Sequence, residues 1–165
     1  MNGELAVQYY RLALSAAARR DLSSAALYAR SACLLGGGQE NAARLLGLCL
    51  YERGELAEAQ NVLSSFPELA ATIREECGAM ENGFERIGSL VRQKKWRGAM
   101  RGARLIPHQS VRILNIQGCL CALAGDNGKA ARFFAKALQK DCGDRLALAG
   151  LMEAVNRKKR LWGSK

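Results

Sequence analysis

Residues 125–142, GDNGKAARFFAKALQKDC, carry a helical pattern of apolar and polar positions. Apolar or small side chains recur at Ala130, Phe133, Phe134, Ala137 and Leu138. Spacings of three and four residues place such side chains on one stripe of a helix, which can then be buried. Gly125 and Asp126, just before the stripe, are typical of a turn followed by a helix cap.

Similar patterns predict helices along the whole chain, and no stretch alternates in the way of a strand. The expected helices cover residues 4–19, 22–35, 40–53, 56–65, 68–95, 96–106, a segment after Ser110, and 144–158. Gly36–Gly38, Pro67 and Pro107 are expected to end helices, and Ser110 is a cap for the next one. The stretch 68–95 is expected to break near residues 78–83, because ECGAMENG contains glycines and is weakly periodic. With 49% hydrophobic residues, only 6% aromatic residues and two prolines, the composition also favours an all-α fold packed through small side chains.

A small residue recurs in the second member of each expected helix pair. These residues are Ala25, Ala59, Ala99 and Ala130. The first interval is 34 residues, and the next two are 40 and 31 residues. A Leu-Gly-like pair precedes the small residue by twelve or thirteen positions: Leu46-Gly47 fits well, Gln117-Gly118 partly, Leu12-Ala13 more weakly, and Arg86-Ile87 is degenerate. A glycine there would let two antiparallel helices approach closely.

The 125–142 segment resembles the second helix of a tetratricopeptide repeat (TPR), whose usual form is close to G-D-x-x-x-A-x-x-x-[YF]-x-K-A-L-x-x-D-P. The matching positions are Gly125, Asp126, Ala130, Phe134, Lys136, Ala137, Leu138 and Asp141, while Cys142 replaces the proline. The resemblance implies a right-handed α-solenoid of three to four antiparallel helix pairs, in a single domain over residues 1–165. Units are expected at 6–39, 40–73, 80–108 and 110–142, with a capping helix at 144–158 in which Gly150 is a weak point.

TPR proteins usually bind a peptide in a concave groove lined by their first helices, so the resemblance implies a non-enzymatic scaffold or adaptor. The corresponding positions are Val7, Tyr10, Leu14 and Ala17, then Asn41, Arg44, Leu48 and Tyr51, and finally Arg112, Asn115, Cys119 and Ala122. Tyr10 and Tyr51 are expected to act as anchors, and Arg44 and Arg112 as contacts for anions. The Lys and Asn side chains with which one TPR subgroup clamps a C-terminal carboxylate are absent at Val7, Tyr10 and Ala17.

Charge divides the chain into two halves. Residues 1–82 hold 7 Lys+Arg against 10 Asp+Glu, while residues 83–165 hold 18 against 5, and the whole chain carries +10. A basic patch is expected at Arg92, Lys94, Lys95, Arg97, Arg101 and Arg104. Its last three members follow the i, i+4, i+7 spacing of one helix face. The patch is interpreted as a solvated basic face, as a surface for an acidic protein segment, or as a site for nucleic acid or anionic lipid.

Two further interpretations follow from charge. The tail RKKR at 157–160 either complements a helix dipole or forms a targeting, lipid or nucleic-acid patch. The opposite charges of the two halves also lead us to expect weak association between copies of the chain, although surface ion pairs are typically worth only about 0–1 kcal/mol each.

Little in the sequence points to catalysis, so no enzyme and no cofactor are expected. The single histidine, His108, follows Pro107 in an expected turn, and Gly36–Gly38 lack the preceding strand and the Gly-Lys-Ser/Thr ending of a phosphate loop. The six cysteines mostly lie in helical patterns and are interpreted as small hydrophobic residues, with redox or zinc use as the alternative. A secretory signal and an apolar run long enough for a membrane span are both lacking, so a cytoplasmic location is expected.

Overall fold

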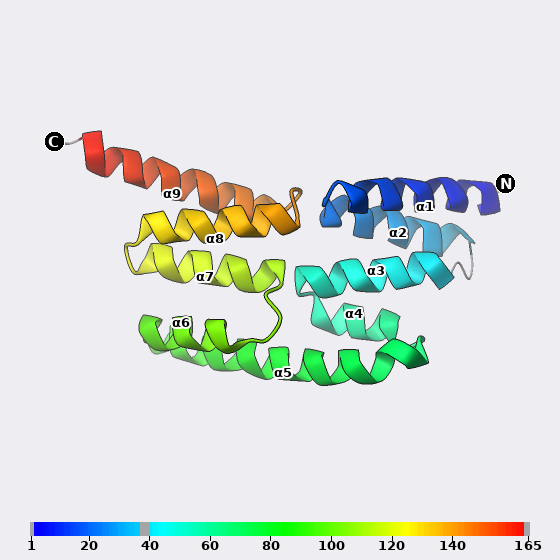
Figure 1. Ribbon diagram of the computed structural model, residues 1–165, viewed down its shortest axis with the longest axis horizontal. Coiled ribbons are helices and arrows are strands. Elements are labelled where there is room, and N and C mark those ends of the chain that lie inside the picture. The colour runs from blue at the N-terminus through cyan, green and yellow to red at the C-terminus, as the bar shows by residue number, and fades with distance from the viewer. Residues whose placement is uncertain (1, 37–39, 164–165) are drawn as a thin grey trace. The chain divides into compact units, whose positions relative to one another are not determined.

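The structure is a computed structural model that describes the backbone of residues 2–36 and 40–163, and the side chains of residues 3–36 and 40–157. Within these ranges it contains nine helices and no strand (Figure 1). They are α1 (Asn2–Ala18), α2 (Leu22–Gly36), α3 (Glu40–Arg53), α4 (Leu56–Leu63), α5 (Pro67–Arg92), α6 (Trp96–Leu105), α7 (Val111–Leu123), α8 (Asn127–Lys140) and α9 (Arg145–Gly163). The predicted all-α class is confirmed.

The chain forms two compact units. The first unit comprises residues 1–77 and Lys140–Gly143, and the second comprises Gly78–Gln139 and 144–165. In the first unit α1 packs against α2, α2 against α3, and α3 against α4, each antiparallel to the helix before it. In the second unit α7 packs against both α6 and α9. That the units together form one repeat domain stays a prediction.

Small residues let the two helices of a pair approach each other closely, as the sequence indicates. Ala25, Ala59, Ala99 and Ala130 are all fully buried. A Cβ atom on Gly47 in α3 would lie 2.4 Å from the Leu63 side chain of α4. A Cβ atom on Gly118 in α7 would lie 2.7 Å from the Phe134 ring of α8. Both glycines therefore have the predicted role of letting two helices approach.

One turn geometry joins the members of every pair. It occurs between α1 and α2, α3 and α4, α5 and α6, and α7 and α8. The residues with positive φ are Arg20 (59°), Gly54 (86°), Lys94 (56°) and Gly125 (81°). In each turn the next N–H donates to the carbonyl five residues earlier, at 2.9–3.0 Å, and the positive-φ residue donates to the carbonyl three residues earlier, at 2.9–3.1 Å. This is the Schellman ending of a helix, repeated four times.

The repeated turn makes a testable prediction at Lys94. A non-glycine residue in the left-handed conformation costs about 1–2 kcal/mol, and a glycine adds only about 0.5–1 kcal/mol of chain entropy. We expect Lys94→Gly to raise the free energy of unfolding by about 0.5–1 kcal/mol, as measured by urea denaturation. Lys95→Gly is the control, because Lys95 already has a φ of −87°. A loss of stability in both variants would contradict the prediction.

Helix α5 corrects one expectation. The predicted break near residues 78–83 is wrong, because Pro67–Arg92 is one helix of 26 residues. Buried apolar residues recur along it at helical spacing, at Ile73, Cys77, Met80 and Ile87. A Cβ on Gly78 would meet no atom of another element within 4 Å, whereas a Cβ on Gly83 would lie 2.8 Å from the Ile106 side chain. Gly83 therefore makes room for a packing partner, and the roughly 1 kcal/mol cost of a helical glycine is too small to end the helix.

Helix ends agree closely with the sequence signals. The Ser110 side chain accepts a hydrogen bond from the Ile113 N–H at 3.4 Å, and Asp126 accepts one from the Lys129 N–H at 3.0 Å, so both expected caps are present. The final helix extends to Gly163, beyond the expected end at residue 158. The expected helix end at Gly36–Gly38 lies partly outside the described residues. Among the helices described, none is long and apolar enough to cross a membrane.

Helix α9 continues without interruption through Gly150, which was expected to be a weak point of the capping helix. A Cβ at this position would lie 2.5 Å from the Phe134 ring, so the glycine gives the ring its place against α9. Because Gly118 of α7 approaches the same ring, two glycines on two helices bracket one aromatic side chain.

The turn that follows α8 belongs to the first unit. The Asp141 carboxylate is fully buried and accepts hydrogen bonds from Ser23, at 3.2 Å from its N–H and 2.8 Å from its hydroxyl. The Cys142 N–H donates to the Arg20 carbonyl at 2.9 Å. Lys140 pairs with Glu52 at 2.9 Å. These contacts join segments that lie far apart in the chain, 118 positions for Asp141 with Ser23 and 88 for Lys140 with Glu52.

Candidate functional site

The expected groove residues differ widely in accessibility. On α1, Tyr10 is half-buried and Leu14 is 45% exposed. On α3, Asn41 and Leu48 are exposed. These four side chains of the first unit could meet a partner.

Tyr51 is buried in the first unit, with 8% of its surface exposed, and its hydroxyl donates a hydrogen bond to the Glu76 carboxylate of α5. Burial, together with this hydrogen bond, raises the pKa of Tyr51 above its ordinary value, so the phenol stays protonated. Tyr51 is therefore buried in the first unit and hydrogen-bonded to α5, and it is not offered to a partner in this structure.

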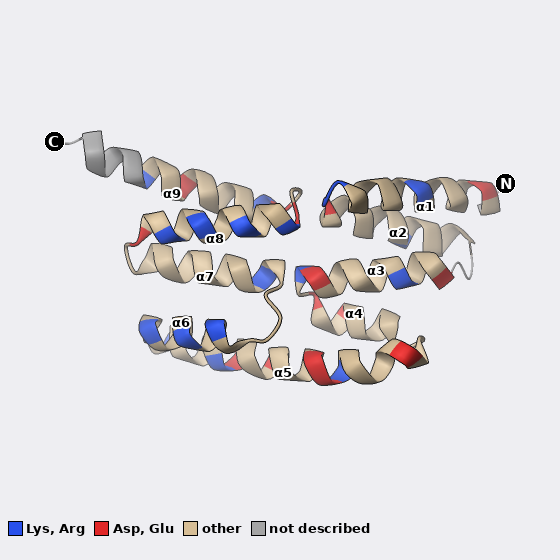
Figure 2. Cartoon of the chain, in the orientation of Figure 1, with Lys and Arg blue, Asp and Glu red and all other residues tan. Residues whose placement is uncertain are grey.

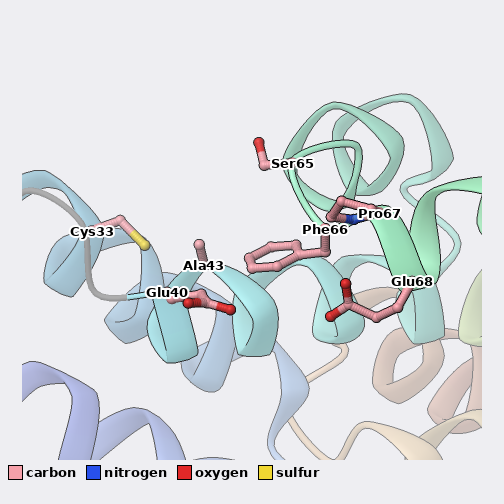
Figure 3. Close-up of a pocket in the computed structure, with 7 residues that line it drawn as sticks. All are labelled: Cys33, Glu40, Ala43, Ser65, Phe66, Pro67 and Glu68. Atoms are coloured by element: carbon pink, nitrogen blue, oxygen red, sulfur yellow. The ribbon is translucent and has the colours of Figure 1, made fainter.

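Arg44 is already engaged by its own unit. Its guanidinium pairs with Glu40 at 3.1 Å and with Glu68 at 2.6 Å, and lies 5.0 Å from the centre of the Phe66 ring. A pocket of about 450 Å³ lies at this place. Figure 3 shows Glu40 on one side of the Phe66 ring and Glu68 on the other. Cys33, Ala43, Ser65 and Pro67 complete its lining. Since the two carboxylates neutralise Arg44, it is not an open contact for an anion.

The groove residues of the second unit are divided in the same way. Arg112 is exposed, with its guanidinium 4.7 Å from the centre of the Phe84 ring. Asn115 is buried, with 4% of its surface exposed, and its amide donates to the Asp144 carboxylate at 2.5 Å. Asp144 also accepts from the Leu146 N–H at 2.9 Å at the start of α9. Asn115 thus helps to hold the start of α9, whereas Arg112 and Cys119 are exposed.

The basic patch is the most open of the predicted sites. All six members are exposed, with Arg92, Lys94 and Lys95 at the end of α5 and in the turn after it. Arg97, Arg101 and Arg104 lie along α6, whose opposite face buries Ala99 and Ala103. Figure 2 shows that α6 bears basic residues and no acidic ones. Within the described part of the chain, none of these three guanidinium groups has a hydrogen bond or an ion pair.

A pocket of about 370 Å³ opens beside these arginines. Helix α6 contributes Trp96, Arg97, Met100, Arg101 and Arg104, helix α7 and its end contribute Leu120, Cys121 and Ala124, and the start of α8 contributes Asp126 and Lys129. We call this the α6 pocket. The sequence patch predicted only its arginines. Of the other lining residues, only Ala124 and Asp126 lie at the α7–α8 turn that the Gly125-Asp126 pair marks in the sequence, and the rest are brought together by the packing of the helices.

Two titratable groups of the α6 pocket have shifted pKa values. Hydrogen bonds from the Lys129 side chain and N–H hold the pKa of the Asp126 carboxyl below its usual range. The Lys129 ammonium lies 2.7 Å from that carboxylate. Burial raises the pKa of the Cys121 thiol. Asp126 is therefore charged and paired at neutral pH, and Cys121 is a neutral thiol.

No protein-family model matches the chain, and no curated protein is detectably similar to it in sequence. Function must therefore be argued from the residues themselves. All six cysteines are free thiols, and burial raises the pKa of Cys49 to about 11. Among the described residues no three His, Cys, Asp or Glu side chains are grouped as a metal site would require.

Proposed function

We propose that this protein is a non-enzymatic interaction module, a TPR-like solenoid of helix pairs that binds a segment of another protein. The observation that carries the proposal is the fourfold recurrence of one helix-pair turn, each followed by a fully buried alanine. Stacked helix pairs of this kind present extended surfaces to partners, and this is their usual function. The TPR-like residues of 125–142 support the same proposal.

Exposed apolar side chains on the first helices supply the partner surface in this proposal. Val7, Leu14 and Leu48 are 38%, 45% and 42% exposed. A partner that covers them would gain about 25 cal/mol for each Å² of apolar surface removed from water. Tyr10 and Asn41 add polar groups beside them, as interfaces commonly require.

We expect the double variant Leu14→Glu/Leu48→Glu to lose the protein that the wild-type chain captures from its native lysate. A partner that covers either new glutamate would have to remove water from its carboxylate, and this costs binding free energy. Leu27→Glu is the matched control, because Leu27 is 61% exposed on the second helix of the first pair. Capture is measured by affinity purification and mass spectrometry, and circular dichroism verifies the fold. Equal capture by all three proteins would contradict the groove assignment.

The alternative function is electrostatic binding of nucleic acid or another anionic surface. The exposed arginines along α6, a helix on which Figure 2 shows basic and no acidic residues, favour it. Such binding weakens steeply with salt, since it depends on the release of counterions. Retention on DNA that disappears at moderate salt, in a chain that captures no protein, would replace the proposed function with this alternative.

A further inference from the structure

The α6 pocket has an apolar floor. Trp96 and Met100 are half-buried, while Leu120 and Cys121 are buried. Because the Cys121 thiol is neutral at pH 7, it contributes as a small hydrophobic group. The volume of about 370 Å³ lies near the lower end of ligand pockets, which span roughly 300–1,000 Å³. The floor therefore suits a single apolar side chain rather than a whole cofactor.

The rim of the α6 pocket is cationic. Arg97, Arg101 and Arg104 are exposed on one face of α6, and the Lys129 ammonium is paired with the Asp126 carboxylate at 2.7 Å. Among the described residues, no carboxylate pairs with the three arginines around this apolar floor. A guanidinium group can donate two parallel hydrogen bonds to one carboxylate, so the rim matches an acidic chain in geometry as well as in charge.

We propose that the α6 pocket binds an acidic segment of a partner protein, which inserts one apolar side chain between Trp96 and Leu120 while its carboxylates pair with the arginines of the rim. This inference rests on the proposed function and names the chemistry of the partner. Tryptophan and arginine are the residue types that most often dominate the energy of protein interfaces. The α6 pocket combines a tryptophan with three arginines whose guanidinium groups have no hydrogen bond or ion pair among the described residues.

The residues of the floor favour a peptide over a nucleic acid as the ligand of the α6 pocket. Single-stranded nucleic acid is held by a run of aromatic residues that stack successive bases, along a groove that follows the phosphates. Of the described residues that line the α6 pocket, one is aromatic, Trp96. Helix α6 has 10 residues and is about 15 Å long, which matches a short peptide segment. Buried Leu120 and Cys121 would add nothing to a phosphate contact.

Trp96 provides the readout for the experiment. The chain has two tryptophans, so in a Trp162→Phe background Trp96 is the sole one. The probes are two synthetic peptides of equal length and charge, one with a leucine between glutamates and one with serine in its place. We expect the leucine peptide to shift the Trp96 emission in a saturable way, and the serine peptide to bind about tenfold more weakly or worse.

Two variants with the same change in net charge test the rim. We expect the affinity for the leucine peptide to fall by about a hundredfold in the rim variant, Arg97→Glu/Arg101→Glu/Arg104→Glu. The control Arg86→Glu/Lys136→Glu/Arg145→Glu changes exposed cations of the same unit that do not line the α6 pocket, and should weaken it only a few fold at physiological salt. The affinities of the two peptides are also compared on the chain with its arginines intact, so the test does not depend on the folding of either variant.

The outcomes separate the two proposals. Equal affinity for both peptides, or equal weakening by both variants, overturns the inference. Tighter binding of a single-stranded oligonucleotide of equal charge, lost in the rim variant, overturns it in favour of nucleic acid. If neither peptide shifts the Trp96 emission, but the chain still captures a partner through Leu14 and Leu48, this inference alone is overturned. If neither peptide shifts the emission and the chain captures nothing, the proposed function is overturned as well.

Discussion

Phe134→Ala is expected to lower the free energy of unfolding by about 3–5 kcal/mol. The ring is 3% exposed and packs in a cluster with Cys121, Ala130 and Ala154. Its neighbours Gly118 and Gly150 carry no side chains that could move into the space left behind. Whole domains are stable by only about 5–15 kcal/mol, so this loss should be evident as an early urea transition followed by circular dichroism.

Adding atoms to the same cluster should also lower the free energy of unfolding. Gly118→Ala should cost about 1–3 kcal/mol, because the new methyl would meet the Phe134 ring, which Gly150 approaches from another helix. Gly78→Ala is the control, since nothing lies within 4 Å of that position, and it should stabilise α5 by about 0.5–1 kcal/mol. Combining Gly118→Ala with Phe134→Leu should cost less than the sum of the single changes. A stabilising Gly118→Ala would show that the two helices are farther apart.

Asp141→Ala is expected to cost about 3–5 kcal/mol, as the loss of one partner from a buried charged network usually does. Its carboxylate accepts from both donors of Ser23 and from the Gly143 N–H, and lies 3.7 Å from the Arg53 guanidinium. Alanine would leave these donors without their acceptor. The change should also speed hydrogen exchange of the Cys142 amide, whose bond to the Arg20 carbonyl depends on the same turn.

Two milder variants serve as controls for Asp141. Asp141→Asn keeps the shape and one acceptor, and Ser23→Ala removes a single hydroxyl, so each should cost about 1–2 kcal/mol. The double variant Ser23→Ala/Asp141→Ala should be less destabilised than the sum of its parts. If Asp141→Ala costs less than Ser23→Ala, the carboxylate does not hold this turn.

The sequence alone determined the helices and the form of their pairs. The starts of α4 and α6, the cap at Ser110 and the close contacts at Gly47 and Gly118 all follow from local signals. Such signals can be read because helix periodicity, capping and turn conformation depend on a few neighbouring residues. The positive-φ residues Arg20 and Lys94 escaped notice, since neither is a glycine, although their turns match those at Gly54 and Gly125.

Tertiary structure decided which side chains are available. Tyr51 and Asn115 occupy predicted groove positions, yet Glu76 and Asp144 bind them internally, and Glu40 and Glu68 neutralise Arg44. The pattern of a helix tells which face is apolar, but not which polar group of another helix lies opposite.

The α6 pocket and the Asp141 turn have the same origin. The pocket joins an arginine stripe to Leu120 and Cys121 of another helix, and Asp141 meets Ser23 across 118 positions of sequence. Contacts of this kind depend on where whole helices come to lie, so they are set by packing rather than by local sequence. The continuity of α5 through Gly78 and Gly83 was decided in the same way, because burial along the helix outweighs the small local cost of two glycines.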